Sequence, residues 1–262
     1  MSDTTALDAA QAGMEANPQD DVARLRFFER LADSELFLLL AEEAQGENIT
    51  PELFDVADGR FVLAFDREDR LARFAERPVP YVALSGRVLS AMLAGQGIGL
   101  GLNLEVAPSS MLIPSEALAW LATTLQHAPE EVQQRLAEFL PPVGLPDDLL
   151  KALDTKLATA VGLAEAAFLV GTKTEKGGSG HMLGFVGAVD GAQSALAKAA
   201  SEALTFSGIE AGAMDVGFFG PHDPATAALA RVGLKFDLPQ PAKHVVERVT
   251  PGSDPDKPPI LK

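Results

Sequence analysis

The feature that most constrains the fold is an uninterrupted apolar run of strand length, Leu36–Ala41, which reads LFLLLA. A strand with one face in water alternates apolar and polar side chains, whereas a continuous apolar run needs cover on both faces. Directly before it, apolar residues recur at helical spacing from Val22 to Ala32, and Asp20 is in position to cap that helix. The chain is therefore expected to pack helices against a sheet.

Turn and cap signals divide the rest of the chain into short elements. Asp58-Gly59 between two apolar segments predicts a β-hairpin. Asp66 and Ser85 are expected to cap two further helices, and Asp223-Pro224 a third. Strands are predicted at 36–41, 53–56, 60–65, 79–84, 98–104, 111–113, 166–170, 182–189, 214–219 and 234–236. This mixture indicates an α+β fold.

A helical connection is expected in the middle of the chain. Pro129 suits a first helical turn, and apolar residues at 132, 136, 139 and 140 fit a helix stripe that Pro141-Pro142 ends. We therefore predict two mixed-sheet domains with packed helices, joined by a helical segment. The predicted division is a flexible N-terminal arm, an N-terminal α+β domain, a helical connection, a C-terminal α+β domain and a Pro-rich tail, at 1–19, 20–127, 128–162, 163–237 and 238–262.

Composition excludes several classes of function. The chain of 262 residues has 21 Lys and Arg against 37 Asp and Glu, a formal charge of −16, and no basic stripe. Such a charge disfavours nucleic acid and anionic membrane surfaces as partners. The absence of cysteine removes disulfides, thiolate nucleophiles and Cys-ligated metals. No secretory signal pattern or membrane-spanning apolar run is evident, so a cytoplasmic location is expected.

Motif searches indicate no catalytic constellation, metal site or cofactor. The four histidines lack metal-ligand spacing and are expected in surface or capping roles. The glycines at 95–101 follow a helix and enter a strand, which is the reverse of a dinucleotide loop, so close backbone packing in a sheet is the better account. The segment 171–180 lacks the phosphate-loop spacing and is expected to be a loop between strands.

Several segments resemble the SseB family of bacteria, which is named for an enhanced-serine-sensitivity phenotype. The segments that carry the resemblance are 27–40, 58–76, 80–105 and 111–121, with 166–191, 214–220 and 233–237 for the family's C-terminal domain. The chain departs from the family pattern after Asn103, where Leu104-Glu105 replaces Pro-Gly, and at Asp66, where a Thr is usual. The resemblance implies an α/β fold, a cytoplasmic bacterial protein and no established enzymatic activity.

Three hypotheses follow for function. The first is a non-enzymatic binding or regulatory protein that uses a surface for a protein or a small ligand. Its candidate residues are Asn103, the single Trp120, and the lysines Lys173 and Lys176. The second is an enzyme of unrecognised class with a cleft between the domains. The third, a type III secretion-associated component, depends only on a shared name.

Overall fold

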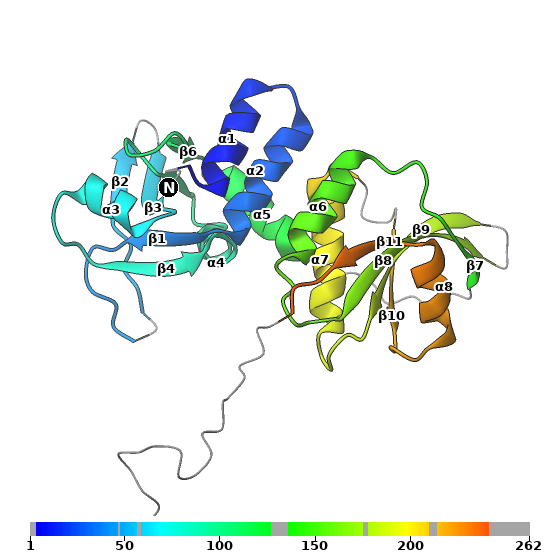
Figure 1. The fold of residues 1–262 in the computed structure, drawn as a ribbon. Coiled ribbons are helices and arrows are strands. Elements are labelled where there is room, and N and C mark those ends of the chain that lie inside the picture. Colours follow the sequence, from blue (N-terminus) through cyan, green and yellow to red (C-terminus); the bar gives the residue numbers. More distant parts are fainter. Residues whose placement is uncertain are drawn as a thin grey trace, which may run out of the picture.

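The computed structural model describes residues 4–46, 48–56, 59–126, 136–174, 178–209 and 214–240, which form two units side by side (Figure 1). The helices are α1 (Ala6–Ala16), α2 (Asp21–Asp33), α3 (Glu68–Ala75), α4 (Gly86–Leu93), α5 (Ser115–Gln126), α6 (Asp147–Leu157), α7 (Gln193–Phe206) and α8 (Pro224–Val232). The strands are β1 (Glu35–Leu39), β2 (Leu53–Val56), β3 (Gly59–Phe65), β4 (Tyr81–Ser85), β5 (Ile98–Leu102), β6 (Met111–Ile113), β7 (Leu136–Leu140), β8 (Ala166–Thr174), β9 (Ser179–Val186), β10 (Asp215–Phe219) and β11 (Leu234–Asp237). The predicted α+β class is confirmed.

The first sheet is mixed and has the order β4-β1-β3-β5-β6, with β2 also paired to β3. Its apolar run is covered on both faces, as expected. Leu36 and Leu38 lie in the main core with residues of α1, α2, α4 and α5, while Leu39 packs on the other face with Phe65 and Leu71. The central strand β1 therefore joins two cores.

The parallel pair β3 and β5 places two chain turns at one edge of the first sheet. Parallel strands need a crossover, which α3, β4 and α4 supply here. The glycines of β5 permit close packing, because a Cβ at Gly101 would lie 2.5 Å from Leu63 Cδ2. Asp66 and Asn103 follow these two strands directly, so their side chains emerge next to each other.

The second sheet has the order β10-β9-β8-β11, with β7 also paired to β8. β9 and β10 run parallel, and the other pairs are antiparallel. Helices α6 and α7 cover one face, where Leu153, Leu196 and Phe185 share a core. Helix α8 covers the other face, where Leu229 packs with Val170 and Met182.

Most of the segment 1–19, whose composition fits either a flexible arm or a loose leading helix, forms the packed helix α1. Helix α1 begins at a capping box in which Thr5 accepts from the Asp8 backbone N–H and Asp8 accepts from the Thr5 N–H. Leu7 is buried in the main core. The buried face of α1 has few apolar residues, which is why hydrophobic spacing alone did not decide between an arm and a helix.

The prediction of a helix over 129–140 is wrong where the structure describes it. Residues 127–135 lie outside the described residues, and 136–140 form β7, which pairs with the second half of β8. The ring of Phe139 lies edge-on to that of Phe219, 6.2 Å between centroids. The predicted C-terminal tail begins with packed residues, since Leu238 is buried and the Gln240 amide donates to the Ala164 carbonyl oxygen; 241–262 lie outside the described residues.

The two units share an apolar joint. Phe206, at the end of α7 in the second unit, is 1% exposed and belongs to the core of the first unit. Helices α2, α5, α6 and α7 meet here (Figure 1). Burying a phenylalanine from one unit in the core of the other couples their stabilities.

We expect Phe206→Ala to lower the free energy of unfolding by about 3–5 kcal/mol, because it removes buried apolar surface and leaves a cavity. Urea denaturation followed by circular dichroism measures this loss. Phe206→Leu should lose less, and Val143→Ala, at a highly exposed side chain, is the control. A loss for Phe206→Ala no larger than that control would contradict the described joint.

Candidate functional site at the joint between the two units

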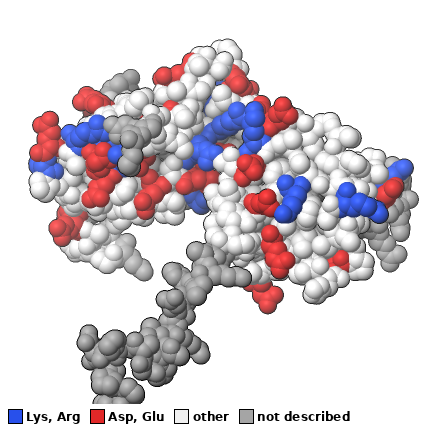
Figure 2. Space-filling model, viewed as in Figure 1, with Lys and Arg blue, Asp and Glu red and all other residues white. Residues whose placement is uncertain are grey.

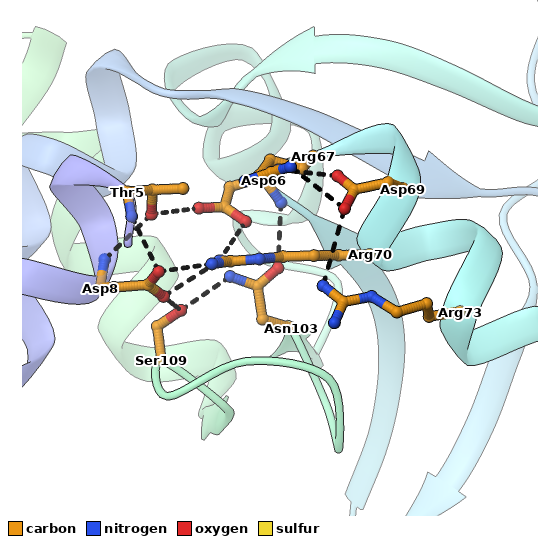
Figure 3. A network of polar contacts seen from close by, with 9 residues as sticks. All are labelled: Thr5, Asp8, Asp66, Arg67, Asp69, Arg70, Arg73, Asn103 and Ser109. Atoms are coloured by element: carbon orange, nitrogen blue, oxygen red, sulfur yellow. Dashed lines mark hydrogen bonds and ion pairs between the residues drawn. The ribbon is translucent and has the colours of Figure 1, made fainter. Parts of the chain in front are cut away.

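Six polar residues converge beneath the first turn of α1, at the edge where β3 and β5 end (Figure 3). They are Thr5, Asp8, Asp66, Arg70, Asn103 and Ser109. The Asp8 carboxylate accepts from both terminal nitrogens of Arg70, at 3.0 and 2.5 Å, and from Ser109 Oγ at 2.5 Å. Arg70 also pairs with Asp66 at 2.8 Å. The network ties α1 to α3 and to the loop after β5.

Asn103 belongs to this network and not to a surface. It is 0% exposed, its Oδ1 accepts from the Asp66 backbone N–H at 3.0 Å, and its Nδ2 donates to Ser109 Oγ at 2.8 Å. Its φ of 48° lies in the left-handed region, which Asn tolerates better than most residues. The prediction that Asn103 meets a ligand or partner is therefore wrong for this structure, in which its side chain holds a turn.

The predicted cap at Asp66 is also a correction. Helix α3 has Arg67 at its N-cap position, with no side-chain capping bond. The Asp66 carboxylate is instead engaged by Arg70 and by the Thr5 hydroxyl, which donates at 2.6 Å. A buried arginine needs carboxylate partners, and this need explains why Asp66 turns away from the helix end.

The protonation of Asp8 is controlled by its neighbours. Burial alone would raise the pKa of Asp8, but hydrogen bonds from Arg70, Ser109 and the Thr5 N–H outweigh burial and hold that pKa well below its usual range. The ionised carboxylate is the form that α1 requires. The network therefore has a structural role, because its groups fasten α1 and hold the turn at Asn103.

A second ionic cluster lies between the two units, and Figure 2 shows Lys and Arg next to Asp and Glu on the surface of this region. Lys156 of α6 is 5% exposed, and its Nζ lies 2.7 Å from Asp33 and 2.8 Å from Glu202. Arg87 of α4 bonds the same two carboxylates, each at 2.8 Å. Since Asp33 and Arg87 belong to the first unit and Lys156 and Glu202 to the second, these ion pairs cross the joint.

Glu29 of α2 adds a third carboxylate to this cluster. The cluster therefore has three carboxylates and two cations, Arg87 and Lys156. Its Oε1 lies 3.8 Å from Lys156 Nζ and has no hydrogen-bond partner among the described residues. Burial raises the pKa of Glu29 despite the attraction of Lys156. Burial would also raise the pKa of Glu202, but Arg87 and Lys156 outweigh it and lower that pKa.

A small pocket of about 250 Å³ opens on this cluster. Its lining includes the charged residues Asp33, Arg87, Lys156 and Glu202, together with apolar residues of α7 and Leu163. The volume is below the roughly 300–1,000 Å³ of typical ligand pockets. The ammonium and guanidinium groups are already bonded to carboxylates of the opposite unit, so this geometry neutralises charge across the joint.

Aromatic side chains close the joint beside this cluster. The ring of Trp120 on α5 lies edge-on to Phe28 of α2, with centroids 5.3 Å apart, and to Phe206 of α7, 6.5 Å apart. We call these three residues the aromatic seam. Trp120 is 40% exposed, so the seam presents a fixed indole to solvent where the two units meet.

The remaining predicted residues are not brought together with the seam. Lys173 is exposed on β8, opposite Glu138 and Ser179, so the predicted loop at 171–180 is in part a strand pairing. Lys176 lies outside the described residues, as do His127 and His244. Within the described ranges, no three His, Cys, Asp or Glu side chains are grouped to hold a metal ion. None of the described helices combines the length and apolar character that crossing a bilayer requires.

Sequence reasoning missed the charged residues of the joint. Lys156 and Asp33 are 123 positions apart, and Arg87 and Glu202 are 115 apart, so no local spacing links them. The network under α1 had one available signal, the capping box formed by Thr5 and Asp8.

We expect Asp8→Asn to lower the free energy of unfolding near neutral pH. This free energy should also fall less in the variant than in the wild type as the pH is lowered. The folded-state pKa of Asp8 is lowered, so its contribution is present above the unfolded pKa of about 3.9 and is lost as pH falls below it. Urea denaturation of both proteins from pH 7 to pH 3 measures this. The difference between them should shrink with acid, while Asp21→Asn at an exposed site should follow the wild type. A constant difference would contradict this account.

We expect Lys156→Met to lower the free energy of unfolding by about 3–5 kcal/mol, because the buried carboxylates Glu29 and Glu202 lose the cation that they share with Asp33. Adding Glu29→Gln should recover part of the loss, because it removes the carboxylate whose pKa burial raises. Lys151→Met on the same helix is the control, since that lysine is exposed and 3.9 Å from Asp148. Equal stability of the two lysine variants would refute the role of Lys156.

A comparison with known proteins supports the family resemblance of the first unit. Residues 5–120 match the family model described as SseB protein N-terminal domain. No curated protein and no solved structure matches the chain. The matched segment begins at the cap of α1 and ends at Trp120, so it contains the first sheet and the network under α1. The first unit therefore contains an SseB N-terminal domain, which confirms over residues 5–120 the resemblance to the SseB family.

Proposed function

We propose that this chain is a non-enzymatic binding protein of the SseB type, which engages a protein partner at the aromatic seam. The observation that supports it is the half-exposed indole of Trp120, held between Phe28 and Phe206. Tryptophan is enriched among the residues that dominate binding energy at protein interfaces. An indole that its neighbours already hold loses little side-chain entropy on binding.

The joint supports the same proposal, because it presents residues of both units as one surface. Phe28 and Trp120 come from the first unit and Phe206 from the second. Cross-unit ion pairs of Lys156 and Arg87 oppose separation of the units. A partner that contacts this seam therefore binds both units in this one arrangement.

The second candidate is an enzyme that uses the pocket at the joint, and one observation favours it. Two ionisable groups with shifted pKa values, Arg87 and Glu202, line this pocket, and such groups are frequent at active sites. We favour binding because Arg87 and Lys156 are bonded to carboxylates, which accounts for their burial without a substrate. Turnover of a metabolite from a substrate panel would decide for the enzyme.

We also propose a cytoplasmic location, in keeping with the acidic, cysteine-free composition. A secretion-associated role depends on the shared name alone, and no contact described above argues for it. The proposal is thus restricted to protein binding at the seam.

The test is affinity purification from the native host with wild type, Trp120→Ala and Leu112→Ala. Leu112 is 40% exposed on β6, as Trp120 is on α5, so it is a matched control. We expect a partner captured by the wild type and the Leu112 variant to be lost from the Trp120 variant. Capture that is the same for all three would contradict the proposal.

Fluorescence provides a second readout with the purified partner, because the chain has a single tryptophan. A partner that covers the seam should shift the indole emission to shorter wavelength. Thermal melts of the variants would show that loss of capture is not loss of folding. An emission spectrum that the bound partner leaves unchanged would place the contact elsewhere.

A further inference from the structure

The strand β10 ends the second sheet with an open edge. It pairs with β9 on one side, and none of the described strands pairs with its other side. Proteins usually protect such an edge with a charged side chain, a proline or a bulge. The sequence of β10 is DVGFF, in which the one charge, Asp215, is at the first residue and the other four residues have no charge, proline or bulge. The outer edge of β10 therefore offers backbone N–H and C=O groups to which another strand could bond.

The hydrogen-bonding groups at this edge can be assigned. The Phe219 carbonyl oxygen accepts from the Gly187 N–H at 3.0 Å, so residue 219 directs its backbone groups toward the β9 side. Successive residues of a strand direct these groups to alternate sides. The N–H and C=O groups of Val216 and Phe218 therefore point outward, two donors and two acceptors.

The side chains at this edge are also open. Phe218 is 37% exposed, and its ring stacks on Phe185 with centroids 5.7 Å apart. Val216 is half-buried on the same face of the sheet. A strand added to β10 would extend this apolar row and cover the Phe218 ring.

We propose that the strand added here is β10 of a second copy of this chain, running antiparallel about a two-fold axis at Gly217. In this register Val216 of each copy faces Phe218 of the other, and the outward groups of both residues exchange two hydrogen bonds at each pair. The two Gly217 residues then face each other at the closely spaced position, where the absence of a side chain permits approach.

The register is self-complementary in charge as well as in shape. Asp215, the only charged residue of the strand, faces Phe219 of the second copy. The two aspartates are then about 13 Å apart along the ladder, beyond the screening length of roughly 8–10 Å at moderate salt. A two-fold interface that uses one patch twice is the commonest arrangement of homo-oligomers. A strand of another protein could make the same backbone hydrogen bonds, but its side chains would not have to pair in this register.

Sedimentation of the full chain tests the proposal. We expect concentration-dependent dimers that become stronger as salt is raised, because each copy carries a formal charge of −16. Phe218→Lys should weaken association roughly tenfold or more. Leu234→Lys, at a similarly exposed residue (42%) of β11 on the opposite side of the sheet, should not. A wild type that stays monomeric, or equal dimerisation of both variants, would overturn the proposal.

Amide hydrogen exchange of the wild type keeps the test independent of whether Phe218→Lys folds. The outward amides of Val216 and Phe218 should be protected at high protein concentration and exchange faster on dilution, while the inward amide of Gly217 should not respond. Protection that persists on dilution and disappears on truncation after Gln240 would assign the edge to residues 241–262 of the same chain, and would also overturn the proposal.

Discussion

The arrangement of the whole molecule depends on the burial of Phe206, a residue of the second unit, in the core of the first. Apolar burial is not directional, so it would not by itself fix the angle between the units. The ion pairs beside it supply direction, because Lys156 and Arg87 each bond a carboxylate of both units. The burial of Phe206 favours association of the units, and the ion pairs of Lys156 and Arg87 fix their orientation.

The two buried polar clusters serve the same purpose at different places. Under α1, the Asp8 carboxylate is held by Arg70, so the first helix is fastened to the edge of the sheet. At the joint, Lys156 is surrounded by carboxylates from α2 and α7. Breaking such a pair is costly because it leaves a buried charge without its partner. The ion pairs of both clusters therefore hold elements of the fold together.

Local signals in the sequence were sufficient for much of the fold. The caps at Asp20, Ser85 and Asp223 were predicted and each accepts a backbone hydrogen bond as expected. The segment 136–140 was not predicted correctly, because a short apolar run fits a helix or a strand and its pairing with β8 decides. The charged cluster at the joint could not be predicted from the sequence for a related reason, because its residues come together only when both units have folded. Trp120 was the one predicted site residue that lies at the joint.

A rigid joint makes the aromatic seam and the open edge of β10 parts of one body, since the seam and the edge lie in units that Phe206 and Lys156 connect. Calorimetric unfolding of the wild type, below the concentration at which it associates, tests this coupling most directly. We expect one cooperative transition in which the van't Hoff enthalpy equals the calorimetric enthalpy. Two separable transitions, one for each sheet, would contradict it.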